Sequence, residues 1–306
     1  MYNRLFFFKL LFLFLCQVSL AQQTILTDSN LPIMVILTDI DPDTNLPIDI
    51  PDEPKVLATM QLIYRPDGTR NYLTDITNDT FLNYNGRIGI ELRGSSSQVL
   101  EKKPYGFTTL MEDDESNNNV NLLGMPSEND WVLNSLAYDP SMVRDYLSYT
   151  LSSNMGNYAP RVKYIEVIVN DDYKGVYILT EKIKRDSDRV NLTKIADFDN
   201  TAPEVTGGYI VKADKINGDD EVAWTMPNSG GWETNFLHHY PKTEDITGQQ
   251  ADYIENIFYD LATQTNPANT SISDGYPSII DIPSFVDYMI MAELASNPDA
   301  YQFSTF

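Results

Sequence analysis

The strongest local pattern in the chain is RVKYIEVIVNDDYKGVYILTEKIKRDSDRVNL, from Arg161 to Leu192. Two runs, Tyr164 to Val169 and Tyr173 to Thr180, are rich in β-branched and aromatic residues, and the turn formers Asn-Asp-Asp separate them. This composition predicts a β-hairpin, and the largely apolar strands favour a place in the middle of a sheet. The rest of the fold must therefore be arranged around an antiparallel sheet that contains this hairpin.

The predicted second strand runs directly into a dense mixed-charge segment, EKIKR, at residues 181–185. Functional side chains are often presented where a buried strand passes into a loop. Basic residues also concentrate in this part of the chain, because residues 81–215 contain 15 of the 21 Lys and Arg residues. We therefore expect an anionic ligand to be held in the middle third of the sequence.

The first 21 residues have the pattern of a secretory signal peptide. Arg4 and Lys9 precede or begin an apolar run, Leu10 to Cys16, and Ser-Leu-Ala at residues 19–21 resembles a cleavage site. A transmembrane anchor is the alternative, but the run is short of the ~20 residues that span a bilayer. We expect export to the periplasm or the exterior. The only cysteine lies in this segment, so the exported chain has no disulfide and no thiol nucleophile.

The chain is strongly acidic, with 44 Asp and Glu residues against 21 Lys and Arg residues and a net charge of −23. Binding of nucleic acid through its phosphates needs basic patches, so we expect no nucleic-acid partner. The acidity does not identify another partner, since a solvated acidic surface explains it equally well.

Periodicity and breaker residues predict an α+β protein with a mostly antiparallel β region followed by a helical C-terminal part. Further strands are predicted at residues 33–37, 55–64, 87–92, 105–110, 131–136 and 207–213. Helices are predicted from Asp139-Pro140 to Gly156, from Gln250 to Thr263 and after Asp281, each with one apolar stripe, and the stripe of the first is expected to be buried. Residues 219–242 are predicted to be a loop. The expected domains are the signal peptide (1–21), a β segment with a linker (22–80) and a main domain (81–306).

Two polar motifs follow or join these elements. Arg93-Gly94-Ser95-Ser96-Ser97 follows the strand at 87–92, and its backbone N–H and hydroxyl groups could cradle a phosphate, although a plain serine-rich turn is the alternative. His238 and His239 are the only histidines. Because they are adjacent, they are not expected to point at one metal ion.

The chain resembles the family of spore-coat protein H-like (CotH) atypical protein kinases. The residues that carry the resemblance run in the family's order, from IGIELRGSSSQ and KKPYGF through LLGMPSENDWVL, YDPSMVRDYL, the hairpin segment and GGYIVKADK to IDIPSFVDYMIMAELASNPDAY. The resemblance implies a kinase-like fold that binds ATP and Mg²⁺ or Mn²⁺. It also implies transfer of the γ-phosphoryl group to Ser/Thr hydroxyls of a protein acceptor, which we expect to be serine-rich.

The resemblance also suggests which residues form the nucleotide site. Lys103 is the candidate for the lysine that contacts the phosphates, and a surface charge is its alternative. Glu181 could pair with it as the helix glutamate does in protein kinases, or could pair with Lys182 or Arg185 on the surface. Arg93, Ser95, Ser96 and Lys182 complete the predicted nucleotide site.

Asp299 is the candidate catalytic base, and Ser304 stands at the fifth position after it, where kinases place an asparagine that helps to hold metal. The family's metal-binding Asp-Phe-Asp segment is expected after residue 306, so we expect the domain to be truncated. Asp197-Phe198-Asp199 looks similar but precedes GGYIVKADK, and is interpreted as a solvated loop. Two alternatives stay open: an inactive extracellular binding or surface-assembly protein on the same scaffold, and an enzyme that transfers AMP.

Overall fold

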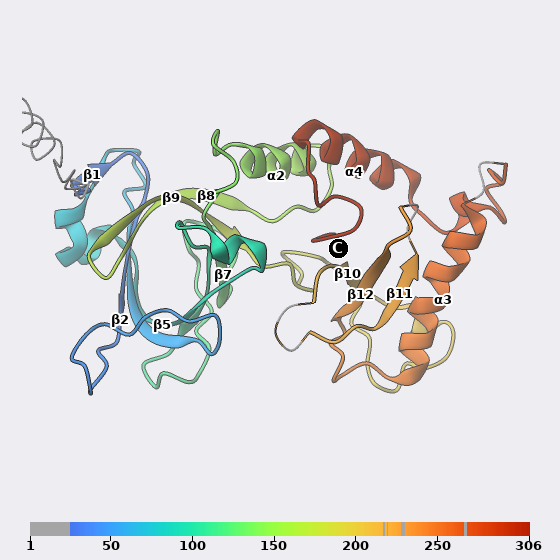
Figure 1. The fold of residues 1–306 in the computed structure, drawn as a ribbon, viewed down its shortest axis with the longest axis horizontal. Coiled ribbons are helices and arrows are strands. Elements are labelled where there is room, and N and C mark those ends of the chain that lie inside the picture. The colour runs from blue at the N-terminus through green and yellow to red at the C-terminus, as the bar shows by residue number, and fades with distance from the viewer. Residues whose placement is uncertain (1–24, 217, 219, 228–229, 266–267) are drawn as a thin grey trace, which may run out of the picture.

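The computed structural model describes residues 25–306 except 217, 219, 228, 229, 266 and 267, so the predicted signal peptide lies outside the described residues. A β-barrel forms one side of the molecule, and a three-stranded sheet with a long helix forms the other (Figure 1). Two further helices run along the top of the same view, over the barrel and the region between the two sides. The class is therefore α+β, as predicted, and strands outnumber the three α-helices of the described residues.

Seven strands close the barrel in the order β2-β3-β5-β6-β7-β9-β8. Their bounds are Ile33–Thr38 (β2), Val56–Ile63 (β3), Leu82–Leu92 (β5), Tyr105–Leu110 (β6), Asp130–Asn134 (β7), Val162–Val169 (β8) and Asp172–Glu181 (β9). Only the β2–β8 pair is parallel, and every other pair is antiparallel. Closure pairs the backbone groups that an open sheet would leave exposed at its edges.

The predicted hairpin is confirmed as β8 and β9. Val169 pairs with Asp172 across a two-residue turn. Asn170 and Asp171 have φ values of 50° and 63° there, which is the geometry of a type I′ turn and one that asparagine and aspartate tolerate. The hairpin lies between β7 and β2, so it is internal to the barrel as expected.

The barrel interior contains the main hydrophobic core. Alternate residues of the strands point inward, and Trp131, Phe107 and Tyr177 are the largest fully buried side chains. A smaller cluster of Ile33, Val35 and other residues lies on the outer side of β2, beneath the 3₁₀ helices Leu73–Thr77 (η1) and Asp79–Phe81 (η2). The 22–80 segment contributes β2 and β3 and thus shares one core with the strands that follow residue 81.

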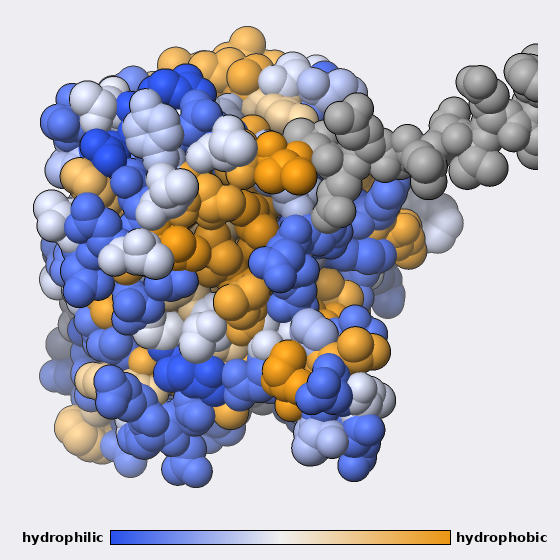
Figure 2. Space-filling view, turned by 90° about the vertical axis from the view of Figure 1, so that its left-hand side faces the viewer, coloured by the Kyte–Doolittle hydropathy of each residue, from blue (hydrophilic) through white to orange (hydrophobic). Residues whose placement is uncertain are grey.

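Short elements complete the barrel side. Asp28–Ser29 (β1) pairs with Asn71–Tyr72 (β4), and the 3₁₀ helix Ser96–Val99 (η3) follows β5. Seen from this side, the surface is largely hydrophilic around a central band of hydrophobic residues (Figure 2). No helix of the described residues is long and apolar enough to cross a membrane.

The second sheet has the order β10-β12-β11, with bounds Ile210–Ala213, Glu233–Tyr240 and Trp224–Pro227. The prediction of a loop at 219–242 was wrong, because β11 and β12 both lie there. Trp224 stacks on Phe236 with ring centroids 5.2 Å apart, and Phe258 of helix Gly248–Gln264 (α3) packs against both. Aromatic packing, rather than an aliphatic run, holds this hairpin. The 3₁₀ helix Glu204–Thr206 (η4) precedes the sheet.

The other two helices are Arg144–Asn154 (α2) and Ile282–Ala295 (α4), with the 3₁₀ helix Tyr276–Ser278 (η5) before α4. Asp281 caps α4 as predicted, since its side chain accepts a hydrogen bond from the Ser284 N–H. The α2 helix begins later than predicted, because the Asp139 carboxylate instead accepts bonds from the backbone N–H groups of Val143 and Arg144 in a preceding turn.

The predicted burial of the apolar stripe on α2 was wrong, and most of the stripe on α4 is also exposed, although Ala292 is buried. The exposed fraction is 48% for Leu147 on α2 and 50% for Met289 on α4. The two helices contact one another, and Tyr146 of α2 stacks on Tyr164 of β8, but much of both stripes stays exposed. Periodicity indicates that a helix has an apolar face and does not show what packs against it.

Candidate functional site

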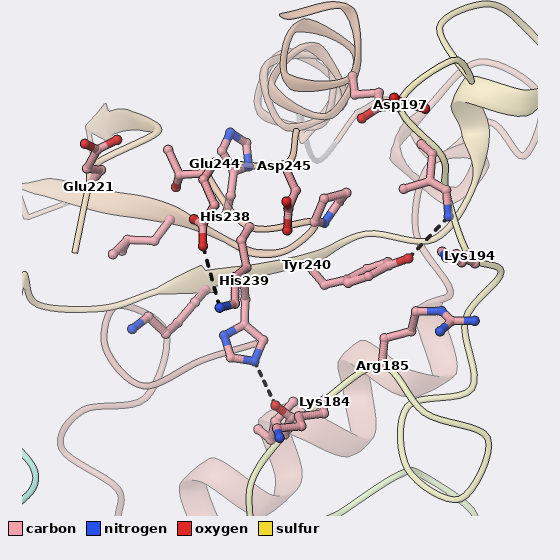
Figure 3. Close-up of a pocket in the computed structure, with 18 of the residues that line it drawn as sticks. Lys184, Arg185, Lys194, Asp197, Glu221, His238, His239, Tyr240, Glu244 and Asp245 are labelled. Carbon is pink, nitrogen blue, oxygen red and sulfur yellow. Dashed lines mark hydrogen bonds and ion pairs between the residues drawn. The ribbon is translucent and has the colours of Figure 1, made fainter. Parts of the chain in front are cut away.

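A cavity of about 1280 Å³ lies where the barrel meets the second sheet. The end of β9 and the segment after it form one side, and β10, β12 and the loops at 194–198 and 241–245 form the others (Figure 3). This places residues 182–185 of the predicted EKIKR segment at the cavity, as expected for a strand that ends at a functional site. The Asp197-Phe198 part of the loop interpreted as solvated also lines it.

Lys182 lines the cavity, and Arg93 lies near enough to influence its pKa; both are cations without a side-chain partner among the described residues. Both side chains are solvent-accessible, yet surrounding protein atoms lower the pKa of each by excluding part of the water around its charge. Partial desolvation together with access to solvent is the environment of a cleft. Within the described residues, neither side chain makes a hydrogen bond or an ion pair. The two lie near one another, because the charge of Arg93 contributes to lowering the pKa of Lys182.

Carboxylates from both sides of the cleft act on these cations. Asp130, at the start of β7, raises the pKa of Lys182 against the larger effect of burial. Asp214, directly after β10, does the same for Arg93. The barrel and the second sheet therefore both contribute charge to one site. Lys212 lies beside it and is paired with Asp220 at 3.3 Å and Asp214 at 3.7 Å.

Ser304, a predicted metal ligand, lies beside Asp214. Its N–H and hydroxyl donate to Asp214 Oδ1 at 3.2 and 3.4 Å. The neighbouring Thr305 exchanges two backbone hydrogen bonds with Ala213 of β10, at 2.8 and 3.1 Å. The C-terminal segment is thus fixed along β10, at the edge of the cleft.

The two histidines point to opposite faces of β12, as their adjacency predicts (Figure 3). His239 Nε2 lies 2.8 Å from the Ile183 carbonyl oxygen, whereas His238 packs against Trp224. Burial lowers the pKa of both. Among the described residues, no group of three or more His, Cys, Asp or Glu side chains is placed to hold a metal ion.

The partners of Glu181 differ from those that the sequence predicts. Its side chain is fully buried and paired with two arginines, Arg161 Nη1 at 3.1 Å and Arg189 Nη2 at 3.2 Å. It therefore neither pairs with Lys103 nor lies on the surface with Lys182 or Arg185. Arg189 is also buried, and it extends the network to Glu128 at 3.7 Å. A buried carboxylate needs such compensation, because its desolvation is costly.

Lys184 continues this network toward the cavity. Its ammonium lies 2.8 Å from Glu128 Oε1 and 2.7 Å from Asp130 Oδ2. Burial opposes ionisation of Asp130, but hydrogen bonds from Lys184 and Thr108 outweigh it and hold the pKa of Asp130 at about 2. Lys184 is thus fully neutralised, in contrast to Lys182 two residues before it.

Lys103 and the serine loop lie on the barrel side. The Lys103 ammonium donates to the Gln98 carbonyl, so it closes the turn that follows Ser95 and Ser96 rather than reaching toward Glu181. Its neighbour Lys102 donates to the Val176 carbonyl and lies 4.6 Å from the centre of the Tyr177 ring. Ser95 and Ser96 are exposed, as expected of a loop that presents donors.

Asp299 is exposed in the segment that follows α4, and its backbone N–H donates to Asn297 Oδ1 at 3.1 Å. Within the described part of the chain, no side-chain hydrogen bond or ion pair joins any two of Arg93, Lys103, Glu181 and Asp299. Lys103 pairs with the Gln98 carbonyl and Glu181 with two arginines, and the expectation that these four residues converge on one cleft stays a prediction. The role of Asp299 stays a prediction.

Sequence reasoning missed Asp130 and Asp214. Each is an aspartate at the end of a strand, in ENDWVL and IVKADK, and each was quoted only as part of a longer motif. The position of an acidic residue at a strand end was the available signal. Its significance depended on which strand ends meet, which the sequence does not contain.

Comparison with known proteins agrees with the resemblance. No curated protein matches the chain. The sequence model of a family described as CotH kinase protein matches residues 90–306. These residues include β6 to β12, the three α-helices and all the residues that line the cavity, whereas β2, β3 and most of β5 precede them. This match covers more than two thirds of the chain. The chain therefore belongs to the CotH kinase protein family, and is a kinase-like protein.

Proposed function

We propose that this protein is an exported atypical protein kinase that transfers the γ-phosphoryl group of ATP to Ser/Thr hydroxyls of a protein acceptor. One observation carries the proposal beyond family membership: Lys182 lines the cavity without a partner among the described residues, and Arg93, which also makes no side-chain contact there, lies near it. In a chain of net charge −23, two unpaired cations in a partly desolvated site favour binding of a polyanion such as a triphosphate.

The residues of the cleft fit the phosphate groups of a nucleotide. Arg93 offers a planar set of N–H donors and Lys182 a flexible point charge, the two kinds of cation that bind phosphates in proteins. ATP supplies the phosphoryl group, and the protein contributes position and charge neutralisation. Ser95 and Ser96, in the loop that begins at Arg93, are proposed as further phosphate donors.

A divalent cation, Mg²⁺ or Mn²⁺, is part of the proposal. Mg²⁺ is often bound through one or two carboxylates together with substrate phosphates and water, so a cluster of three protein ligands is not required. Asp214 and Ser304 place a carboxylate and a hydroxyl side by side, 3.4 Å apart between Oδ1 and Oγ. We propose Asp214 as the principal protein ligand and Ser304 as a weaker one.

Asp299 is proposed to orient the attacking hydroxyl. It precedes Ser304 by five residues and lies in the segment that Thr305 fixes to β10. The carboxylate is exposed and makes no hydrogen bond or ion pair within the described residues, so it is free to accept a hydrogen bond from an acceptor hydroxyl.

Paired radiolabels test the proposal. The purified protein, a serine-containing acceptor and Mg²⁺ or Mn²⁺ should give labelled acceptor from γ-³²P-ATP and none from α-³²P-ATP. Asp299→Asn should reduce the label by roughly 10²-fold or more, in the range of general-base effects. Asp197→Asn, in the loop with the similar Asp-Phe-Asp sequence, is the matched control and should retain it.

The alternatives give different results. Label from α-³²P-ATP would show AMP transfer and overturn the kinase assignment. Binding of ATP without transfer to any acceptor would favour an inactive binding or surface-assembly protein. Loss of label in Asp197→Asn but not in Asp299→Asn would place the chemistry at the 197–199 loop.

A further inference from the structure

A second pair of cations in the cavity, Arg185 and Lys194, lies beside the ring of Tyr240. Arg185 follows β9, and its Nε donates to the Leu192 carbonyl at 3.1 Å. Its guanidinium carbon lies 5.6 Å from the centre of the Tyr240 ring. A hydrogen bond and a cation–π contact thus fix the direction of this side chain.

Tyr240 also fixes the segment that carries Lys194. Its hydroxyl accepts a hydrogen bond from the Ile195 N–H at 3.3 Å, and Ile195 is buried. Figure 3 shows Arg185 and Lys194 beside the outer end of the Tyr240 side chain. One tyrosine therefore positions both cations on the same side of the cavity.

Neither cation is neutralised by the protein. Within the described residues, Lys194 makes no hydrogen bond or ion pair, and the two terminal nitrogens of Arg185 have no partner. Two other lysines of the cavity differ: Lys184 is paired with two carboxylates, and Lys242 lies 3.6 Å from Glu244. Carboxylates are abundant in this chain, so two adjacent unpaired cations mark a place where an external anion completes the charge balance.

The acidic residues of this part of the cavity lie elsewhere. Asp197 and Asp245 lie above the Tyr240 side chain in Figure 3, and Arg185 lies below it. Glu244 is the partner of Lys242. The basic subsite is therefore local to the Arg185 side of the ring, so it can bind one anionic group rather than attract polyanions in general.

The size of the cavity favours a second substrate as the molecule that carries this anion. Small-molecule sites are usually about 300–1,000 Å³, and this cavity, at about 1280 Å³, has space beyond a nucleotide. In the proposed function, Lys182 and the nearby Arg93 bind the phosphates, and the neutralised Lys184 separates Lys182 from Arg185 along the chain. A second anion-binding group in the same cavity suits the other substrate of a kinase, the acceptor.

We propose that Arg185 and Lys194 bind an oxyanion on the acceptor, a carboxylate or a phosphoryl group close to the target hydroxyl. The proposal rests on the proposed function and adds the substrate class: acceptors in which Asp, Glu or an already phosphorylated serine neighbours the target. The planar guanidinium of Arg185 can bind either group with two parallel hydrogen bonds.

Binding of fluorescent peptides, measured by anisotropy without ATP, tests the subsite directly. Four peptides share one target serine and carry neighbouring Glu, phosphoserine, Ala or Lys residues. The Glu and phosphoserine peptides should bind roughly 10-fold or more tightly than the Ala peptide, as expected for one charge-assisted pair. The comparison between them shows whether a carboxylate or a phosphoryl group is the better ligand.

Two variants assign the effect. Arg185→Gln/Lys194→Gln should remove the preference for acidic peptides, and Lys194→Gln alone, which breaks no contact of the described structure, should reduce it. Lys242→Gln removes a lysine of the same cavity that is already paired, and should leave the preference unchanged. Equal binding of all four peptides, or a preference that survives the double variant, would overturn the proposal.

Transfer assays separate this proposal from the proposed function. Selective binding of acidic peptides without γ-phosphoryl transfer would support the subsite and count against the kinase. Transfer with equal KM for acidic and neutral peptides would support the kinase and reject the subsite.

Discussion

Glu181 and Lys182 are adjacent in sequence and have opposite environments. The Glu181 side chain is fully buried between Arg161 and Arg189, whereas Lys182 enters the cleft and has no partner among the described residues. Successive side chains of an extended strand point to opposite faces, so one strand end supplies both. The comparison teaches that charge density does not identify a site, and that the pairing of each charge separates structural from functional groups.

The largest expected difference between the environments of Glu181 and Lys182 is in their contribution to stability. Arg189→Met leaves the buried Glu181 with one arginine fewer and should lower the free energy of unfolding by about 3–5 kcal/mol, as for other broken buried pairs. Lys182→Met should change it by less than about 0.5 kcal/mol, since it removes no contact. Urea denaturation of both variants checks this. Equal destabilisation by the two would mean that Lys182 also has a structural role.

The next largest expected effect is on the pH dependence of stability, and it comes from Asp130, which is paired with Lys184. The folded pKa of Asp130 is about 2, below the ordinary 3.8, so its contribution is present above about pH 4 and is lost as the pH falls toward 2. Since one pKa unit corresponds to about 1.4 kcal/mol, the contribution is at most about 2–2.5 kcal/mol. Lys184→Gln should remove much of this dependence, measured as the free energy of unfolding between pH 5 and pH 2.

Lys242→Gln provides the control for that measurement. Lys242 and Glu244 form an exposed pair, and such pairs contribute little to stability. The variant should follow the wild-type pH dependence. A similar flattening in both lysine variants would show that net charge, rather than the Lys184–Asp130 contact, sets the acid sensitivity.

The same contrast explains how much could be predicted from the sequence. The β8–β9 hairpin was predictable because its strands and its Asn170-Asp171 turn are adjacent in sequence. The environment of Glu181 was not, because Arg161 and Arg189 approach it only when β8 pairs with β9 and the following loop folds back. The β11–β12 hairpin was missed because Trp224 and Phe236 pack across strands and onto Phe258, a contact without a local pattern.

Only part of the candidate site could be predicted, because only some of its residues belong to local sequence patterns. Arg93 and Lys182 were predicted from local charge and motif; Lys182 lines the cavity and Arg93 lies near it, and their role in nucleotide binding stays a prediction. Asp214 and Asp130 gained meaning only from the meeting of two strand ends. Lys103 was preferred to Lys182 because it begins a strand after the serine loop, but its ammonium donates to the Gln98 carbonyl.

The smallest expected effect tests this preference for one lysine over the other. Lys182→Gln removes an unpaired cation of the cleft and should weaken ATP binding roughly 10-fold, the effect of one charge-assisted contact to phosphate. Lys103→Gln retains a donor for the Gln98 carbonyl and should weaken it by less than about 2-fold. Calorimetric titration with ATP and Mg²⁺ measures both, and Arg93→Gln should behave like Lys182→Gln. If Lys103→Gln had the larger effect, the ammonium of Lys103 would have to leave Gln98 when nucleotide binds, and the distinction between paired and unpaired cations would fail as a guide to this site.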